Sequence, residues 1–238
     1  MSTAAKRSRV EKTADTRRRM LDAAFASFAE SGYHGATMAA IAKRAGVAEP
    51  TMYFTFHSKA ELLQAVLGHA SAGRSEPAMV DQRPWFLGVL DEPDPRRMIA
   101  LVVEHGTNIL QSLAPLEQTM SQAAAIDSAA AEVFAEISSR RREGFTRIVT
   151  AATERASLAL SIDRALDIID VVQSAPTFNA FMARGWRLVE FKAWSFGVLT
   201  ECLLPLPTRA KTGAANAAAT VGLTFRDLIE RDGEAAAT

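Results

Sequence analysis

Residues 37–59 read TMAAIAKRAGVAEPTMYFTFHSK and decide how the N-terminal part of the chain folds. Ile41 and Ala45 lie at helical spacing, so they mark the apolar face of a first short helix. Gly46 stands where the chain must reverse, because glycine adopts the left-handed conformation of a tight turn at least cost. A second helix follows, with Pro50 in its first turn. This order predicts a helix-turn-helix, whose second helix lies in the major groove of DNA.

Capping signals on both sides of this motif place its neighbouring helices. Thr37 precedes the first helix of the motif as a cap, and the second helix is predicted over 49–54. Ser58 and Glu61 form the pattern of a capping box, which starts a further helix of the N-terminal region. An apolar stripe over 16–31 predicts the helix that comes before the motif.

Composition favours an all-α fold. The 238 residues are 48% hydrophobic and 7% aromatic, and alanine is frequent throughout, which favours helix over sheet. The net charge is zero, but residues 1–70 carry ten basic and six acidic side chains, so this end is +4 and the rest of the chain is −4. A basic end on a mildly acidic body is typical of a phosphate-binding module joined to a larger domain.

The remaining chain reads as further helices separated by proline and glycine. Residues 73–95 hold four prolines and two glycines and are predicted to be a broken connector. The predicted helices then cover 96–113, 116–125, 129–160, 162–174, a short segment to 184, and 186–204. In the Ala/Thr-rich tail, only 221–229 is expected to form a helix.

The motif resembles the DNA-binding segment of the TetR (tetracycline-repressor) family of bacterial transcription regulators. The matching residues are Thr37, Ile41-Ala42, Ala45-Gly46-Val47, Thr51-Met52-Tyr53, Phe56, Ser58-Lys59 and Leu62-Leu63. The resemblance covers about 16–67, and one departure is Thr55, where the family often has histidine. Beyond this segment the resemblance rests on helical character and length alone.

Side chains of the motif can be assigned expected roles on DNA. The first turns of a recognition helix read base edges, which predicts base contacts for Ala48, Glu49, Pro50 and Thr51. Tyr53 and Thr55 lie further along the same helix, and Tyr53 has the reach to bond a phosphate. The predicted contacts to the DNA backbone are Thr37, Lys43, Arg44 and Lys59.

The resemblance also implies an effector pocket and a dimer surface in the larger domain. Aromatic and polar residues set among apolar helices are the pocket candidates: Trp85, Phe86, Met98, His105, Asn108, Gln111, Met120 and Gln122. The last two long helices are the dimer candidates: Ile168, Val171, Val172, Trp194, Val198 and Leu199. A helix that is apolar nearly all round is buried on both sides, either inside one subunit or between two.

Enzyme chemistry finds no support in the sequence. The four histidines show no metal-ligand spacing, and neither a phosphate-binding loop nor a dinucleotide-binding glycine motif is present. We therefore expect no cofactor, no metal and no catalytic residues. The single Cys202 and the lack of a long apolar run predict a soluble bacterial cytoplasmic protein, located at the nucleoid when bound to DNA.

These expectations define four regions and one favoured function. The regions are a disordered basic arm (1–14), a DNA-binding domain (15–70), an effector-binding and dimerisation domain (71–207) and a tail (208–238). The favoured function is a homodimeric repressor that a small molecule releases from a near-palindromic operator on double-stranded DNA. Two alternatives stay open: a DNA-binding architectural protein without an effector, and a helical protein-interaction module.

Overall fold

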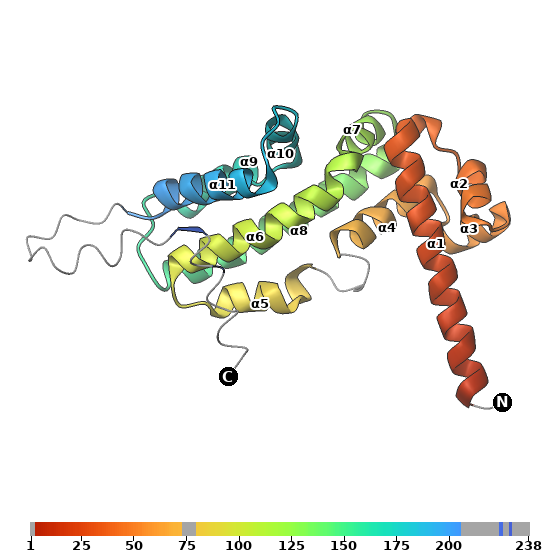
Figure 1. The fold of residues 1–238 in the computed structure, drawn as a ribbon, viewed down its shortest axis with the longest axis horizontal. Helices are drawn as coiled ribbons and strands as arrows, with labels where there is room; N and C mark the ends of the chain where they lie inside the picture. The colour runs from red at the N-terminus through yellow and green to blue at the C-terminus, as the bar shows by residue number, and fades with distance from the viewer. Residues whose placement is uncertain (1–2, 73–79, 206–223, 226–228, 230–238) are drawn as a thin grey trace, which may run out of the picture. The chain divides into compact units, whose positions relative to one another are not determined.

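The computed structural model describes residues 3–72, 80–205, 224, 225 and 229, and no strand occurs among them. The predicted all-α class is therefore confirmed. Figure 1 shows the helices, with these bounds: α1 (Thr3–Gly35), α2 (Met38–Ala45), α3 (Glu49–Phe56), α4 (Lys59–Ser71), α5 (Pro84–Asp91), α6 (Pro95–Leu113), α7 (Glu117–Ile126), α8 (Ser128–Thr153), α9 (Ile162–Val172), α10 (Ala175–Met182) and α11 (Leu188–Leu203). Two 3-10 turns, Val80–Gln82 and Ala114–Leu116, complete the described elements.

The chain divides into two compact units. The N-terminal unit combines residues 1–77 with 112–139, and the C-terminal unit combines 78–111 with 140–238. The predicted DNA-binding domain ended at residue 70, whereas the N-terminal unit also takes in α7 and the first part of α8. Such a long-range association of segments leaves no local signal in the sequence.

One apolar core holds the N-terminal unit together. Phe28, Ile41, Met52 and Leu63 from four successive helices are fully buried in it. Leu116 and other apolar residues from 113–137 pack against the same core. The core thereby fixes α2 and α3 on the scaffold of α1, α4 and α7.

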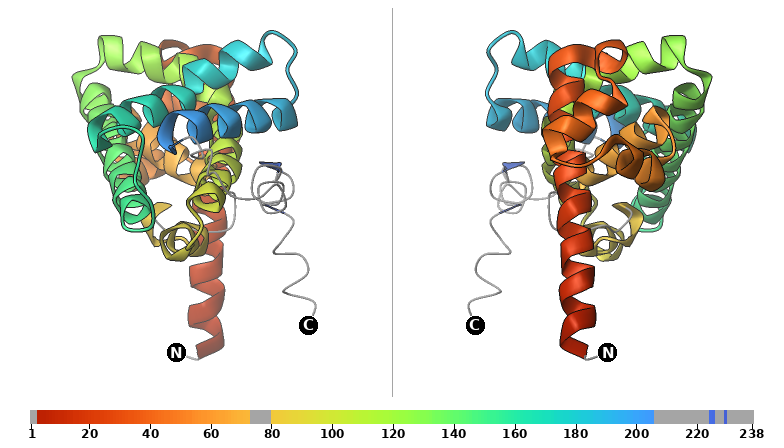
Figure 2. Two further views of the ribbon diagram at one scale, coloured as in Figure 1. Left: turned by 90° about the vertical axis from the view of Figure 1, so that its left-hand side faces the viewer. Right: turned by 90° about the vertical axis from the view of Figure 1, so that its right-hand side faces the viewer.

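The first helix is longer than predicted. The basic arm was expected to be disordered through residue 14, but α1 begins at Thr3, and this prediction is wrong. The segment 3–14 contains neither glycine nor proline, so nothing in it stops the helix that 16–31 requires. Figures 1 and 2 show the first turns of α1 running beyond α2, α3 and α4 of the same unit. Near its other end the helix is broken at Gly32, whose φ is 67°.

Two other boundaries in the C-terminal unit also differ from the prediction. Residues 84–91, expected to lie in a broken connector, form α5, because Pro84 stands in the first turn where its missing N–H costs nothing. Helix α8 ends at Thr153 rather than near residue 160. Past this end, Arg155 donates from Nη1 to the carbonyl of Ala151 and from Nη2 to that of Leu90, both at 2.5 Å.

The tail helix predicted over 221–229 lies outside the described residues, apart from Thr224, Phe225 and Ile229.

A buried tyrosine joins distant parts of the N-terminal unit. Tyr33 is 2% exposed, and its hydroxyl donates to Asp127 Oδ2 at 2.5 Å. The backbone amides of Ala129 and Ala130 donate to the other carboxylate oxygen, so Asp127 also caps α8. The Tyr33 hydrogen bond is the largest influence that holds the pKa of Asp127 below its usual value.

We expect Tyr33→Phe to lower the free energy of unfolding by about 1.5–3 kcal/mol, because it removes a hydrogen bond to a charged acceptor. Urea denaturation measures the change, and Tyr53→Phe, which removes an exposed hydroxyl, is the matched control. The pKa of Asp127 is lower in the folded state than in the unfolded state. Its ionised carboxylate therefore stabilises the fold at pH values above the unfolded-state pKa. This contribution is lost as the pH falls through the folded-state pKa. The variant should therefore lose less stability than the wild type between pH 5 and about pH 2. Equal stability of the two proteins at pH 7 would contradict this role of Tyr33.

Candidate nucleic-acid interface

Backbone and side-chain contacts fix the turn between α2 and α3. Thr37 Oγ1 accepts from the amide of Ala40 at 3.2 Å and caps α2 as predicted. Gly46 has φ 67° and ψ 39°, the left-handed conformation expected of it. The carbonyl of Ala45 accepts from Arg19 Nη1 at 3.0 Å, which ties the end of α2 to α1. The local geometry of the predicted helix-turn-helix is thus confirmed.

Helix α3 buries one side and presents the other to solvent. Met52 is fully buried and Phe56 is 3% exposed, so both hold the helix on the core. The first turn faces outward: Ala48, Glu49, Pro50 and Thr51 are all exposed. Ala48 provides no side-chain cap, which leaves this end of the helix open to an external acceptor. The four predicted base-reading positions are therefore brought together on one accessible surface.

The second turn of α3 adds a residue that the sequence prediction missed. Tyr53 is 46% exposed, as its predicted contact with DNA requires, but the adjacent Phe54 is 84% exposed. An aromatic ring held in water on a short helix costs free energy unless a partner covers it. The burial of Met52 and Phe56 would have indicated that 53 and 54 both point away from the core. Thr55 is half-buried, and its hydroxyl donates to the carbonyl of Thr51 at 2.8 Å.

The residues predicted to contact the DNA backbone differ in the partners that their side chains already have within the protein. Thr37 and Lys43 are exposed. Arg44 already forms a bidentate pair with Glu30, with nitrogen–oxygen distances of 2.6 and 2.8 Å. Lys59 donates from Nζ to the carbonyl of Tyr33 at 2.8 Å, and its ammonium lies 4.2 Å from the centre of the Tyr33 ring. Arg44 and Lys59 would have to exchange these internal partners for a phosphate.

The eight candidate pocket residues are divided between the two units. Met120 and Gln122 belong to the N-terminal unit, where the Gln122 amide lies against Gly32. In the C-terminal unit, His105 stacks on Trp85 with ring centres 4.7 Å apart, and its burial lowers its pKa. Phe86 is 2% exposed and packs with Met98 in an apolar cluster that Trp85 also contacts, its ring centre 5.8 Å from that of Phe86. Trp85, Phe86, Met98 and His105 therefore lie together in the C-terminal unit, and the pocket roles of the eight residues stay predictions.

An apolar cavity does lie within the C-terminal unit. Its volume is about 30 Å³, which is space for about two water molecules. Among the eight candidates only Met98 lines it. The other walls come from the same unit and are apolar side chains: Pro95, Ile99 and Val102 of α6, Phe145, Ile148, Val149 and Ala152 of α8, Leu158, Ile169 of α9, and Leu199, Leu203 and Leu204 in and after α11.

Polar side chains without partners are buried along the helices that line this cavity. Thr107 and Ser195 are fully buried and Gln173 is 2% exposed, and neither the two hydroxyls nor the Gln173 amide has a hydrogen-bond partner. Thr200 Oγ1 and Arg96 Nε, next in the chain to cavity-lining Leu199 and Pro95, are also buried without a partner. Each such group costs about 1–3 kcal/mol of stability. The remaining candidates of the predicted pocket lie nearby on α6: Asn108 accepts from Lys192 Nζ at 2.9 Å, and Gln111 is exposed.

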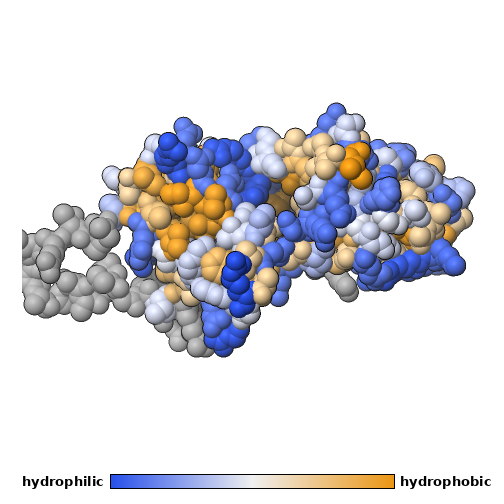
Figure 3. Space-filling model, turned by 90° about the horizontal axis from the view of Figure 1, so that it is seen from above, coloured by the Kyte–Doolittle hydropathy of each residue, from blue (hydrophilic) through white to orange (hydrophobic). Residues whose placement is uncertain are grey.

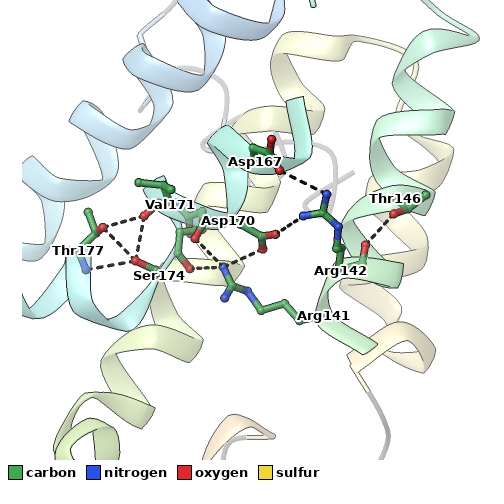
Figure 4. A network of polar contacts seen from close by, with 9 residues as sticks. Arg141, Arg142, Thr146, Asp167, Asp170, Val171, Ser174 and Thr177 are labelled. Carbon is green, nitrogen blue, oxygen red and sulfur yellow. Dashed lines mark hydrogen bonds and ion pairs between the residues drawn. The ribbon is translucent and has the colours of Figure 1, made fainter. Parts of the chain in front are cut away.

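Two arginines of α8 hold the end of α9 in place (Figure 4). Arg141 donates from Nη2 to the carbonyls of Asp170 and Gln173, at 3.1 and 3.0 Å. Arg142 pairs with the carboxylates of Asp170 and Asp167, at 2.9 and 3.3 Å. These contacts satisfy carbonyls that every helix leaves free at its last turn, and they fix the backbone of Gln173.

The predicted dimer residues separate into two groups. Val172 and Leu199 are 5% and 1% exposed and belong to the core of the C-terminal unit, so their predicted place on a surface is wrong. Val171 is 65% exposed, and Ile168, Trp194 and Val198 are half-buried. Val189 and Trp186 add further exposed apolar area, at 57% and 37%. Figure 3 shows apolar side chains gathered over α9 and α11.

Comparison with known proteins agrees with the helix-turn-helix geometry. Residues 20–66 match the family model of bacterial regulatory proteins, tetR family. The HTH-type transcriptional regulator SrpR of Pseudomonas putida is 41% identical over 70 residues, which are 29% of this chain and 31% of that protein. The chain thus matches about a third of the length of this relative. No helix among the described residues is long and apolar enough to cross a membrane.

Solved structures resemble the fold over most of the chain. A candidate transcriptional regulator from Saccharomonospora viridis, in complex with choline, has a TM-score of 0.63 at 14% identity and covers 80% of this chain and 98% of its own. The transcriptional regulator FadR from Bacillus subtilis, in complex with stearoyl-CoA, has a TM-score of 0.57 at 19% identity and covers 76% and 96%. At these identities the likeness shows the fold alone.

Proposed function

We propose that this chain, whose N-terminal helix-turn-helix belongs to the TetR family, is a DNA-binding transcription regulator that acts as a homodimer and responds to a small molecule. The observation that carries the proposal is the outward face of α3, where exposed side chains of the first two turns stand on a buried base of Met52 and Phe56. A helix of this kind reads base edges with its first turns. The relatives matched over this segment are named as transcription regulators.

Each exposed residue of α3 receives a role from its chemistry. The Glu49 carboxylate can accept from a cytosine amino group, and Pro50 can contact a thymine methyl. The Thr51 hydroxyl can bond a base or a phosphate, and the Tyr53 hydroxyl a phosphate. Phe54 supplies an apolar ring that can pack against a thymine methyl or a sugar.

The test of this proposal is Tyr53→Ala, measured by fluorescence anisotropy on the duplex upstream of the protein's own gene. We expect at least a tenfold weaker affinity, because a phosphate contact and the ring packing are lost together. Gln118→Ala, an exposed change on α7 of the same unit, is the matched control and should have no effect. Wild-type binding should also weaken steeply as salt rises, since phosphate contacts release counterions. Undiminished affinity of Tyr53→Ala, together with a flat salt response, would contradict the proposal.

A second copy of the chain is the partner that the surface of α9 and α11 fits best. Exposed Val171, Val189 and Trp186 give this surface an apolar character that is typical of interfaces between subunits. Two-fold pairing places two reading helices at half-sites one helical turn apart, about 34–36 Å. A near-palindromic operator follows from that symmetry.

A small-molecule effector is supported by the C-terminal unit. It holds an apolar cavity of about 30 Å³ and buried polar groups without partners; small-molecule sites combine these two features in a larger space. The structural neighbours bound to choline and to stearoyl-CoA carry ligands in the same fold. An effector can shift the DNA-binding equilibrium only through its different affinity for the two states of the protein. Helices α6 and α8 contain residues of both units, so they are the covalent route for such coupling.

A further inference from the structure

The apolar cavity and the unpartnered polar groups occupy neighbouring turns of the same three helices. On α9, Ile169 lines the cavity and Gln173 follows four residues later. On α11, Leu199 lines the cavity and Ser195 precedes it by four residues. In a helix, residues four apart lie on the same face, one turn from each other. On each helix, a buried hydrogen-bonding group therefore lies one turn away from a residue of the apolar cavity wall.

On helix α6, too, a buried hydrogen-bonding group lies about one turn from a residue that lines the cavity. Val102 lines the cavity, and Gly106 and Thr107 lie one turn further along. Contacts of Lys192 with Glu104 and of Phe196 with Arg96 show that α6 and α11 run antiparallel, so a later turn on α6 meets an earlier turn on α11. The three polar groups are thus displaced from the cavity toward the same side.

Glycine at position 106 is what admits the Gln173 side chain. A Cβ at this position would lie 2.8 Å from Gln173 Oε1, closer than real contacts allow. The amide therefore rests against the bare backbone of α6, next to Thr107. Arg141 fixes the backbone of Gln173 through its carbonyl, at 3.0 Å. The amide is positioned by its surroundings while both of its polar atoms lack partners.

The charges around this polar set are already balanced. Lys192 Nζ lies 2.7 Å from Glu104 Oε1 and also donates to Asn108 Oδ1 at 2.9 Å. Burial lowers the pKa of neighbouring His105, which favours its neutral form. Arg96, whose buried Nε lacks a partner, lies toward the opposite end of α6, with its guanidinium 5.7 Å from the centre of the Phe196 ring, so it is not beside Gln173. A charged ligand group beside Gln173 would be buried without a counter-charge, which is strongly unfavourable.

We propose that Gln173, Thr107 and Ser195 bind the uncharged, hydrogen-bonding head of an amphiphilic effector whose alkyl chain enters the adjoining apolar cavity. An amide or alcohol head fits best, because Gln173 offers both a donor and an acceptor and the hydroxyls can do either. An alkyl chain is the slimmest apolar group, which suits a cavity of about 30 Å³ that has to widen around its ligand. This inference deepens the proposed function and rests on it for the role of the ligand as an effector.

Three amphiphiles with unbranched tails of similar length but different heads test the proposal: decanamide, decanoate and decyltrimethylammonium. Binding to the full chain is measured by calorimetry below micelle-forming concentrations. We expect decanamide to bind at least about tenfold more tightly than either charged probe, since the charged heads lack a counter-charge. Equal or tighter binding of a charged probe overturns the proposal, as does the absence of binding by all three.

Variants locate the head group. Gln173→Leu should weaken decanamide binding about tenfold, because two hydrogen bonds to the ligand are lost. The melting temperature of the variant should equal or exceed that of the wild type, because a buried unpaired amide is gone. Gln111→Leu, an exposed glutamine of α6, is the matched control and should leave affinity unchanged. Thr107→Val keeps the shape of the side chain and should also weaken decanamide binding. It replaces Gln173→Leu as the test variant if that protein fails to fold. Unchanged affinity in the folded variants overturns the proposal.

Operator binding without any probe separates this inference from the proposed function. A chain that binds its operator but none of the probes would retain the proposed function and refute the amphiphile site. A chain that binds decanamide but no operator would refute the proposed function and retain the site.

Discussion

Val171→Asp is expected to convert the protein to a monomer and to lower its affinity for a two-half-site operator by about 10²–10⁴-fold, the usual gain from linking two binding modules. The side chain is 65% exposed on α9, so a carboxylate there is solvated in the single subunit and its fold should be unchanged. Between two copies the same carboxylate would be buried without a counter-charge. The mass from light scattering and the affinity from anisotropy are measured on the same samples.

Val80→Asp is the matched control for this change. Val80 is 36% exposed and lies outside α9 and α11, so the dimer and its operator affinity should be unaffected. A Val171→Asp protein that stays dimeric would exclude α9 as part of the interface. A wild-type chain that is monomeric at assay concentration would exclude the dimer itself.

Gly46→Val is expected to destabilise the N-terminal unit by about 1–3 kcal/mol and to abolish measurable operator binding. The backbone at this position has φ 67°, a conformation that β-branched residues adopt rarely and at a cost. Relief of that strain changes the turn, and with it the angle at which α3 leaves α2. Binding then fails because the exposed residues of α3 no longer meet base edges in register.

Gly68→Ala supplies the control for glycine replacement. Gly68 lies within α4, and a Cβ there would meet no atom within 4 Å. Alanine in a helix interior stabilises by about 0.5–1 kcal/mol relative to glycine, so this variant should be slightly more stable and bind DNA normally. Normal operator affinity in Gly46→Val would show that the turn does not set the position of α3.

The motif was predicted correctly because its signals are local. Thr37, Gly46, Pro50 and Ser58 each fix a cap or a turn through their own chemistry, and the structure places all four as expected. Ser58 Oγ accepts from the amide of Glu61 at 3.0 Å, which is one half of the predicted capping box. Family resemblance over the same residues added their expected roles on DNA, which stay predictions; the family model matches residues 20–66.

Features that depend on distant residues could not be predicted. The hydrogen bond between Tyr33 and Asp127 joins residues 94 positions apart, and it places the start of α8 with the N-terminal unit. His105 and Gln122 were grouped as pocket candidates by helix composition, but they lie in different units. The absence of partners for Gln173 is a property of the packed structure, since its sequence neighbours are an ordinary helix end.

The most direct test of DNA recognition by α3 is competition anisotropy of the purified full chain on its own upstream duplex, with a scrambled duplex as competitor. We expect the scrambled sequence to compete at least a thousandfold less well, the low end of the range for specific DNA-binding proteins. We also expect Glu49→Gln to change which base pairs are preferred while retaining most of the affinity. Equal competition by the scrambled duplex would contradict the assignment of α3 as a recognition helix.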